Sequence, residues 1–270
     1  MLNLHDNEFD YITSYIKTHY GVNLEKKRHL IEGRLSNHIA SLGFSNYMEY
    51  FESAIQDKKG QEMTSLINKL TTNHTYFLRE KSHFDFYREH VLPWIDKKLQ
   101  CKDLRVWSAG CSSGQEPYTL AILDADYFGV SHTGLDCTLL ASDISNKALD
   151  SAKKGIYTGE ELSHMPDAWK SKYFVKLDDQ HFEVSETIKK NVAYRYFNLL
   201  SPFPFKRPFH AIFCRNVMIY FDTPTKSDIV TKFYNALLPG GYFFIGHSES
   251  LSSCKHKFKY VMPSVYQKVD

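Results

Sequence analysis

Hydrophobic residues in the first 70 positions recur at helical spacing, and no stretch there alternates as a strand would. Phe9, Ile12 and Ile16 lie three to four positions apart, and Gly21 follows where a helix can end. The same spacing recurs in residues 25–43, 45–55 and 60–73. We therefore expect a helical N-terminal domain over residues 1–70, built as a small bundle of short helices.

The pattern changes after residue 71. Residues 82–99 keep helical spacing over a longer stretch, and Ser82 is suited to cap the first turn. We assign residues 71–98 to a linker and a connecting helix.

Short apolar strands then alternate with helices. The strands are expected at 104–109, 137–143, 192–198, 210–216 and 241–247, and the helices at 116–128, 145–153 and 223–238. This alternation predicts an α/β domain over residues 99–270 with a mostly parallel, doubly wound sheet. Apolar runs without polar alternation indicate strands covered on both faces. Residues 257–269 are expected to add two antiparallel strands at an edge.

Residues 155–191 interrupt the alternation. Period-two segments flank the turn-like sequence DDQ at 178–180. We expect a small antiparallel β-subdomain, inserted at about 158–191 between the second and third core strands.

Composition narrows the function classes. A net charge of +2 indicates no overall field for nucleic acid, and 43% hydrophobic residues are typical of a soluble globular protein. No apolar run reaches the roughly 18 residues of a membrane span. The N-terminus lacks a basic signal-peptide region, and no cysteine pair has CxxC spacing. We expect a reduced, cytoplasmic protein with no metal site and no membrane insertion.

Charge is uneven near the N-terminus. Residues 17–34 hold only two acidic residues against five basic ones, which are Lys17, Lys26, Lys27, Arg28 and Arg34. The stretch is either a solvated helix face or a docking surface for an acidic partner.

The sequence RVWSAGCSSGQEPYTLAIL at 105–123 predicts a strand, a small-residue loop and a helix. Gly110 and Gly114 frame the loop, so that backbone N–H groups can approach a ligand closely. Glu116 stands at the helix start, where a dinucleotide pyrophosphate would disfavour negative charge. A carboxylate there suits a cationic group such as an amino group. The alternative is a tight strand–helix turn without a ligand.

Other polar residues follow predicted strands or the domain junction. Asp143 ends its strand, where an acidic residue can accept hydrogen bonds from ribose hydroxyls, or it can cap the next helix. Arg215 and Asn216 end another strand, with Tyr220 close behind; an arginine–carboxylate pair at the sheet edge is the alternative. Further candidates stand at the junction of the two domains: Asn73, Thr75 and Arg79.

Together these segments resemble the CheR family of chemotaxis receptor methyltransferases. The matching pieces occur in the family's order: TTNHTYFLRE, VWSAGCSSGQEPYTLAI, ASDIS, GIY, FNLL, AIFCRNVMIYFD and GGYFFIGHSES. The resemblance implies a class I S-adenosylmethionine-dependent methyltransferase with a Rossmann-like doubly wound sheet, a helical N-terminal domain and an inserted β-subdomain. It implies methyl transfer to glutamate side chains on the cytoplasmic helices of chemoreceptors, with S-adenosylhomocysteine as product.

The resemblance also implies site residues. Around the cofactor it places Asn73, Thr75, Arg79, Glu116, Asp143, Asn198, Leu199, Arg215 and Asn216, besides Gly110 of the loop. Arg79 and Tyr220 would flank the transfer site, and the basic stretch with Lys26, Lys27 and Arg28 would meet the glutamate-rich receptor helices. The loop has GQEP where many relatives have GEEP, but Glu116 is retained.

Some relatives use the β-subdomain to hold a receptor pentapeptide through a longer, glycine-containing loop. Residues 176–184 are short and lack glycine, so we expect independence from that tether. Three alternatives stay open: another class I methyltransferase, a cofactor-binding sensor or scaffold without turnover, and a nicotinamide-dependent oxidoreductase. The missing GxGxxG disfavours the last.

Overall fold

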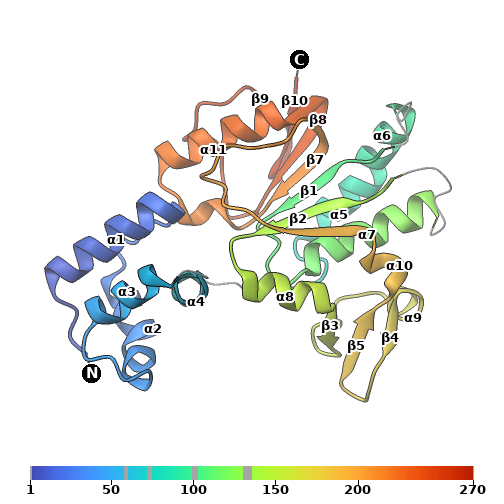
Figure 1. The fold of residues 1–270 in the computed structure, drawn as a ribbon. Coiled ribbons are helices and arrows are strands. Elements are labelled where there is room, and N and C mark those ends of the chain that lie inside the picture. The colour runs from blue at the N-terminus through green and yellow to red at the C-terminus, as the bar shows by residue number, and fades with distance from the viewer. Residues whose placement is uncertain (1, 58–59, 72–74, 99–102, 130–135, 270) are drawn as a thin grey trace. The chain divides into compact units, whose positions relative to one another are not determined.

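A computed structural model describes residues 2–57, 60–71, 75–98, 103–129 and 136–269 (Figure 1). Its contacts divide the chain into two compact units. The first unit, which we call the helical unit, comprises Met1–His74 and Tyr220–Lys226. The second, the α/β unit, comprises Thr75–Ile219 and Ser227–Asp270. Among the described residues, no helix has the length and apolar character needed to cross a membrane.

The helical unit contains the helices that the hydrophobic spacing predicts. They are α1 (Asp6–Tyr20), α2 (Arg28–Ser41), α3 (Tyr47–Gln56) and α4 (Gln61–Leu70). Their apolar faces meet in a core with Ile16, Ile31 and Phe51, whose side chains are fully buried. Gly21 ends α1 in the left-handed conformation, with φ of 75°, and its N–H donates to the Lys17 carbonyl.

The α/β unit is built on a seven-stranded sheet. Its strands are β1 (Val106–Ala109), β2 (Leu139–Asp143), β6 (Val192–Tyr196), β7 (Phe209–Cys214), β8 (Leu237–Ile245), β9 (Phe258–Met262) and β10 (Val265–Lys268). The order is β6-β2-β1-β7-β8-β10-β9, in which the pairings from β6 to β8 are parallel and β10 pairs antiparallel with both β8 and β9. The predicted parallel sheet and its antiparallel edge are confirmed.

The strand order places the site. From β1 the chain proceeds outward through β2 and β6 on one side, and then through β7 and β8 on the other. The order therefore reverses between β1 and β7, and ligands of open α/β sheets bind at the carboxyl ends of the strands beside such a reversal. The helices that follow these strands are α7 (Gln115–Phe128), α8 (Asn146–Lys154) and α11 (Thr223–Ala236).

The connecting helix is not uniform. It runs as α5 (Lys81–Phe86), a π-helical turn (Tyr87–Val91) and α6 (Leu92–Lys98). Pro93 lacks an N–H to donate to the preceding turn, and a π-helical turn directly before it is a local way to accommodate this. The predicted N-cap at Ser82 is wrong, because the helix starts after Glu80, whose φ is 57°.

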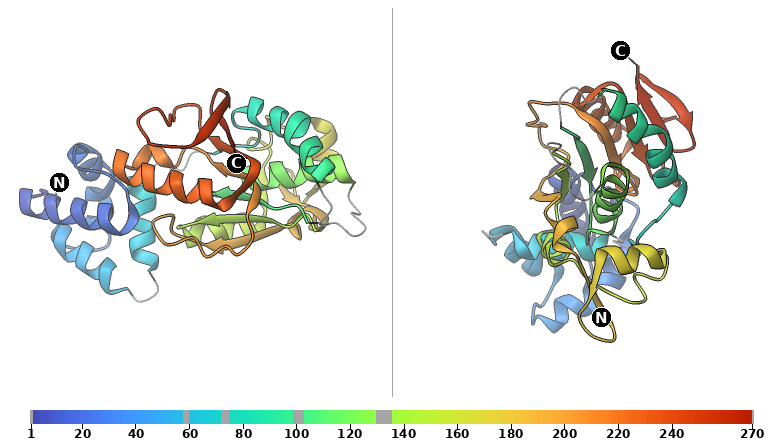
Figure 2. Two further views of the ribbon diagram at one scale, coloured as in Figure 1. Left: turned by 90° about the horizontal axis from the view of Figure 1, so that it is seen from above. Right: turned by 90° about the vertical axis from the view of Figure 1, so that its right-hand side faces the viewer.

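The insertion forms its own antiparallel sheet in the order β3-β5-β4, set apart from the large sheet in Figure 1 and visible from two other directions in Figure 2. Its elements are β3 (Ile156–Thr158), α9 (Asp167–Tyr173), β4 (Phe174–Lys176), β5 (His181–Val184) and α10 (Glu186–Lys189). Tyr157 links this sheet to the loop after β1, because its hydroxyl donates to the Ser113 carbonyl at 2.7 Å.

Candidate functional site

The loop after β1 is held in a conformation that glycine permits. Gly110, Ser112 and Gly114 have φ of 82°, 48° and 97°. The N–H groups of Gly110 and Cys111 both donate to the Ser142 carbonyl, at 2.7 and 3.0 Å. A Cβ at Gly110 would clash with Val217, and one at Gly114 would lie 2.8 Å from the Tyr157 hydroxyl. The loop is therefore fixed by backbone hydrogen bonds to the end of β2 and packs closely against the side chains of Val217 and Tyr157.

Asp143 stands beside this loop at the end of β2. Its carboxylate accepts from the N–H groups of Ser112 and Ser145, each at 2.8 Å. Burial raises the pKa of Asp143, and these backbone hydrogen bonds oppose the rise. Ser145, not Asp143, caps α8 by accepting from the Ala148 N–H, so the N-cap alternative is wrong. Each carboxylate oxygen retains a lone pair for a ligand hydroxyl.

Glu116 does not face the loop as an isolated charge. One of its oxygens accepts from the Ser108 hydroxyl at 2.6 Å, and the other accepts from Arg215 at 2.9 Å. We expected a ligand to supply the cationic partner of Glu116, but Arg215 of the same chain supplies it. A carboxylate at this helix start is consequently weaker evidence for a cationic ligand than its position in the sequence indicates.

Arg215 is the centre of the opposite side of the site. Its side chain is only 3% exposed and forms a second ion pair with Glu80 at 3.0 Å. It also donates to the Arg79 carbonyl and lies over the Phe84 ring. Arginine–carboxylate pairing, the alternative for Arg215, is therefore present, although β7 is a central strand and not an edge. Its buried Nε has no hydrogen-bond partner among the described residues.

Asn216 continues this network from a left-handed backbone, with φ of 59°. Its N–H donates to Glu249 at 2.9 Å, and its side-chain amide donates to Glu80 at 3.3 Å. Glu249 also accepts from the N–H groups of Gly246 and Ile219, at 2.6 and 3.1 Å. Burial raises the pKa of Glu249, and these hydrogen bonds oppose the rise.

Glu80 and Glu249 are absent from the candidates taken from the sequence. Burial would raise the pKa of Glu80, but the Arg215 charge and hydrogen bonds from Arg215, Asn216 and the His247 N–H lower it overall. Both glutamates lie in segments that carry the family resemblance, Glu80 at the end of TTNHTYFLRE and Glu249 within GGYFFIGHSES, and these segments are the sequence signal that could have found them. Their partners lie 135 and 33 positions away, beyond the reach of local patterns.

We call Gly110–Glu116 with Asp143 the glycine half of the site. The arginine half is Glu80, Arg215, Asn216 and Glu249.

The remaining candidates are placed less tightly. Thr75 and Arg79 are half-buried, and Asn73 lies outside the described residues. The side chain of Asn198 accepts from the Leu200 N–H at 2.9 Å, and Leu199 is buried. Tyr220 belongs to the helical unit, where its carbonyl accepts from the Asn23 N–H at 2.8 Å.

The basic stretch divides into held and free side chains. Lys17 pairs with Glu25 and Asp222 at 2.7 and 3.1 Å, and Arg28 pairs with Asp6 at 2.5 Å while donating to the Leu4 carbonyl. Arg28 also lies over the Phe9 ring. Lys26 and Lys27 are exposed and form no ion pair with a described residue. Arg34 donates to the carbonyls of Lys69 and Thr71, so of the five basic side chains in this stretch, Lys26 and Lys27 are the two without a contact to a described residue.

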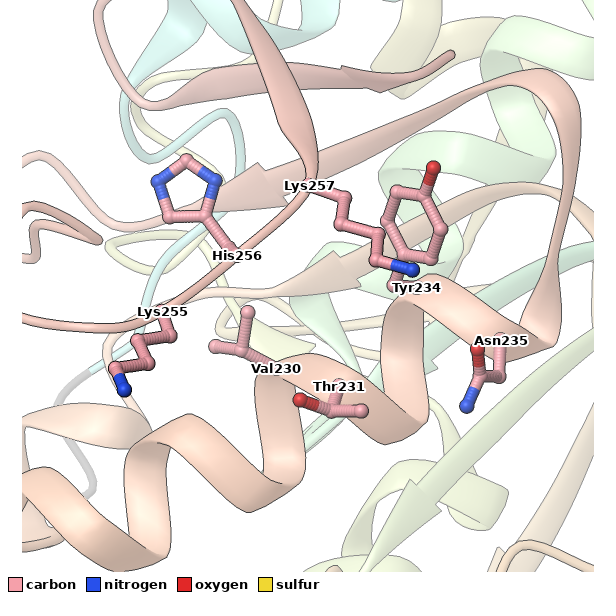
Figure 3. Close-up of a pocket in the computed structure, with 7 residues that line it drawn as sticks. All are labelled: Val230, Thr231, Tyr234, Asn235, Lys255, His256 and Lys257. Carbon is pink, nitrogen blue, oxygen red and sulfur yellow. The ribbon is translucent and has the colours of Figure 1, made fainter. Parts of the chain in front are cut away.

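A separate cavity of about 320 Å³ lies between α11 and the segment before β9 (Figure 3). It is lined by Val230, Thr231, Tyr234, Asn235, Lys255, His256 and Lys257. None of the candidate site residues lines it. Its lysines and histidine are exposed, so the cavity is a basic surface hollow separate from the candidate site.

The residues at the switch point fit an S-adenosyl cofactor. Asp143 has acceptor capacity for hydroxyl groups, and the buried Nε–H of Arg215 has no hydrogen-bond partner among the described residues. These two groups suit a ligand that carries hydroxyl and carboxylate groups.

Comparisons with known proteins agree with this geometry. Residues 73–266 match the family model "CheR methyltransferase, SAM binding domain", and residues 7–71 match "CheR methyltransferase, all-alpha domain". A chemotaxis protein methyltransferase of Borreliella burgdorferi is 39% identical over 99% of this chain and 96% of its own length. That of Escherichia coli is 34% identical over 98% and 92%.

Among solved structures, the glycopeptide N-methyltransferase MtfA complexed with S-adenosylmethionine is 11% identical over 58% of this chain and 48% of its own. Its TM-score of 0.33 is too low to carry an argument. The family models instead cover both the helical and the α/β parts of the sequence, in order and almost without a gap. The chain belongs to the CheR family of S-adenosylmethionine-dependent methyltransferases.

Proposed function

We propose that this protein transfers a methyl group from S-adenosylmethionine to glutamate side chains of chemoreceptors, forming glutamyl methyl esters. The match to the SAM-binding family model over residues 73–266 carries this proposal, since that range includes both halves of the site. The chemotaxis methyltransferases that align along almost the whole chain support receptors as the substrate.

Both halves have a role in holding the cofactor. Asp143 would accept hydrogen bonds from the ribose hydroxyls, and Arg79 with Arg215 would meet the amino-acid end. Asn73, Thr75, Asn198, Leu199 and Asn216 would complete the pocket, with Gly110 allowing close approach. When bound, the cofactor supplies an electrophilic methyl group on a sulfonium cation.

The reaction needs no general base from the chain. A glutamate carboxyl has a pKa of roughly 4.3, so at neutral pH the substrate is already a nucleophile. Cys111, the thiol within the loop, is buried, and burial raises its pKa so that it stays protonated. Attack by a carboxylate on a sulfonium methyl group neutralises charge, so alignment and exclusion of water are the main contributions of the chain.

Arg79 and Tyr220 would align the reactants. Arg79 would orient the cofactor or the incoming carboxylate, and the Tyr220 hydroxyl would position the substrate. Arg79→Ala should lower turnover or cofactor affinity by about 100-fold, the effect of a misaligned reactant. Near-normal values of both kcat and cofactor affinity in this variant would remove Arg79 from the site.

The substrate would be presented by the cytoplasmic helices of the receptors, which are rich in glutamate. Lys26 and Lys27 are the exposed cations available to meet them. Replacing both with Glu should weaken methylation of receptors without changing cofactor affinity. Arg28 is left intact in this test, because its contacts with Asp6 and Phe9 are internal to the helical unit. Equal loss of cofactor binding in the double variant would indicate misfolding instead of docking.

The β-subdomain would act without a receptor tether. The turn between β4 and β5 is short, and Asp178 closes it by accepting from the N–H groups of Gln180 and His181. Calorimetry with peptides from receptor C-termini should show no binding, and micromolar affinity would refute this proposal.

The central test is transfer of a tritiated methyl group from S-adenosylmethionine to receptor-containing membranes. We expect label on the receptor that mild base releases, as a glutamyl ester requires. Base-stable label would indicate a methyltransferase with another substrate group. Cofactor binding without any label would indicate a sensor or scaffold.

A further inference from the structure

Three ligand-type side chains converge beside the arginine half of the site. Glu80 and His83 lie at the start of α5, and His247 follows β8. Their donor atoms all lie within 4.8 Å of one another. The Glu80 carboxylate lies 3.5 Å from Nδ1 of His83, and the His247 N–H donates to Glu80 at 3.1 Å. We call these three residues the histidine cluster.

His83 is the buried member of the cluster. The Glu80 carboxylate and the Pro263 carbonyl lie beside its ring, but neither ring nitrogen forms a well-aligned hydrogen bond with a described residue. Buried polar groups are normally well paired, so this ring keeps the capacity to bind a ligand, a water or an ion.

The geometry of the two rings fits one shared ion. A metal bound at 2.0–2.1 Å from a ring nitrogen lies about 3.2 Å from the ring centre, so two ligating rings have centres about 5 Å apart. The centres of His83 and His247 are 4.6 Å apart, with ring planes at 81°. His247 is exposed, so its ring can adjust and an ion can enter from solvent.

The ligand types also agree with one class of ion. Glu80 stands directly before α5 and His83 lies in its first turn, which brings the carboxylate to within 3.5 Å of the imidazole. Two imidazoles and a carboxylate suit Zn²⁺ and similar divalent transition metals, with a fourth position left for water. We propose that the histidine cluster binds one divalent transition-metal ion of the Zn²⁺ type.

This site would share Glu80 with the arginine half. Both oxygens of Glu80 already accept hydrogen bonds, from Arg215 on one and from Asn216 and the His247 N–H on the other. A carboxylate has about four lone-pair sites, so a metal can join, but its charge competes with Arg215 for the same group. We therefore expect metal binding to weaken cofactor binding. This expectation rests on the proposed function, whereas the proposal of the metal site does not depend on it.

The test is a titration of the full chain with Co²⁺, followed by visible spectroscopy and calorimetry. We expect one Co²⁺ per chain with nitrogen and oxygen ligands, displaced by Zn²⁺. His247→Ala should weaken binding by at least about 10-fold, since even the loss of an outer-shell partner costs roughly 10–100-fold. Because His247 is exposed, its replacement should leave the protein folded, and the backbone N–H at position 247 can still donate to Glu80.

His181→Ala is the matched control, because His181 is another exposed histidine beside a carboxylate, 2.9 Å from Asp178. Binding should be unchanged in this variant. Binding that persists in His247→Ala, or that is lost in His181→Ala, would overturn the proposal, as would a thiolate charge-transfer spectrum or no stoichiometric binding at all. His83→Asn gives a second check: if it folds, it should lose the ion as well.

The link to the cofactor is measured separately. The affinity for S-adenosylhomocysteine should fall several-fold with one equivalent of Zn²⁺ in the natural chain and should not change in His247→Ala. An equal fall in both proteins would disprove the link. Stoichiometric Co²⁺ binding without any effect on S-adenosylhomocysteine would leave the metal site standing and argue against Glu80 as the shared group.

Discussion

The two halves of the site are built from different forces. In the glycine half, backbone N–H groups of the loop donate to the end of β2, and left-handed φ values shape the loop. In the arginine half, Arg215 and Glu80 meet across 135 positions of the chain in an ion pair that is almost closed to solvent, and Arg215 also pairs with Glu116 of the glycine half. A change in the first half should therefore act through strain, and a change in the second through unpaired buried charge.

The largest effect should follow from Arg215→Ala, which leaves Glu80 and Glu116 without their buried cation. Breaking such a pair costs about 3–5 kcal/mol of unfolding free energy. The matched control is Arg207→Ala, whose side chain is 63% exposed beside Asp103 and should cost less than about 1 kcal/mol. Denaturant unfolding measures both. If both variants lost a similar free energy of unfolding, burial of the ion pairs in the arginine half would contribute nothing to stability.

Gly110→Ala should have the next largest effect, through crowding against Val217 and a φ of 82°. A left-handed alanine alone costs about 1–2 kcal/mol, and the clash adds to this. Gly60→Ala isolates the strain, because Gly60 is left-handed, with φ of 64°, and no atom lies near the added Cβ. Val217→Ala should partly rescue Gly110→Ala in thermal unfolding; without rescue, crowding is not the cause.

Glu80→Gln tests the arginine half by pH. The folded pKa of Glu80 lies below its ordinary value, so its contribution is present above the unfolded pKa of about 4.3 and is lost as pH falls through the folded pKa. The variant should be about 1–3 kcal/mol less stable at pH 7, with the gap closing below about pH 4. A gap that is constant across this range would mean that the charge of Glu80 is unimportant.

The smallest effect should come from Gln115→Glu in the glycine half. Gln115 is buried, accepts from Ser113 at 2.8 Å and donates to Glu161 at 3.3 Å. A carboxylate there would face Glu161, so we expect a loss of about 1 kcal/mol that Glu161→Gln reverses. This is the position where many relatives of the family have Glu. If a double-mutant cycle showed no coupling between positions 115 and 161, the contact with Glu161 would not be the reason that this chain has Gln at position 115.

Local patterns were sufficient for much of the fold. The spacing of Phe9, Ile12 and Ile16 predicts α1, and the apolar run at 210–216 predicts the buried strand β7, because these periodicities arise from the geometry of one helix or strand. Caps were less predictable. Ser82 and Asp143 both have the right chemistry, but backbone conformation placed the first cap at Glu80 and the second at Ser145.

By itself, the sequence determined the order of helices and strands, the glycine loop, and the polar residues at the strand ends, since each depends on residues close together in the chain. Only the tertiary structure decided that Arg215 would neutralise Glu116, that Glu80 and Glu249 would hold Arg215 and Asn216, and that His247 would reach His83. The physical reason is that ion pairs and ligand clusters depend on distances across the sheet, which local periodicity does not encode. The expectation of no metal relied on cysteine spacing, whereas the histidine cluster spans 167 positions and exists only after folding.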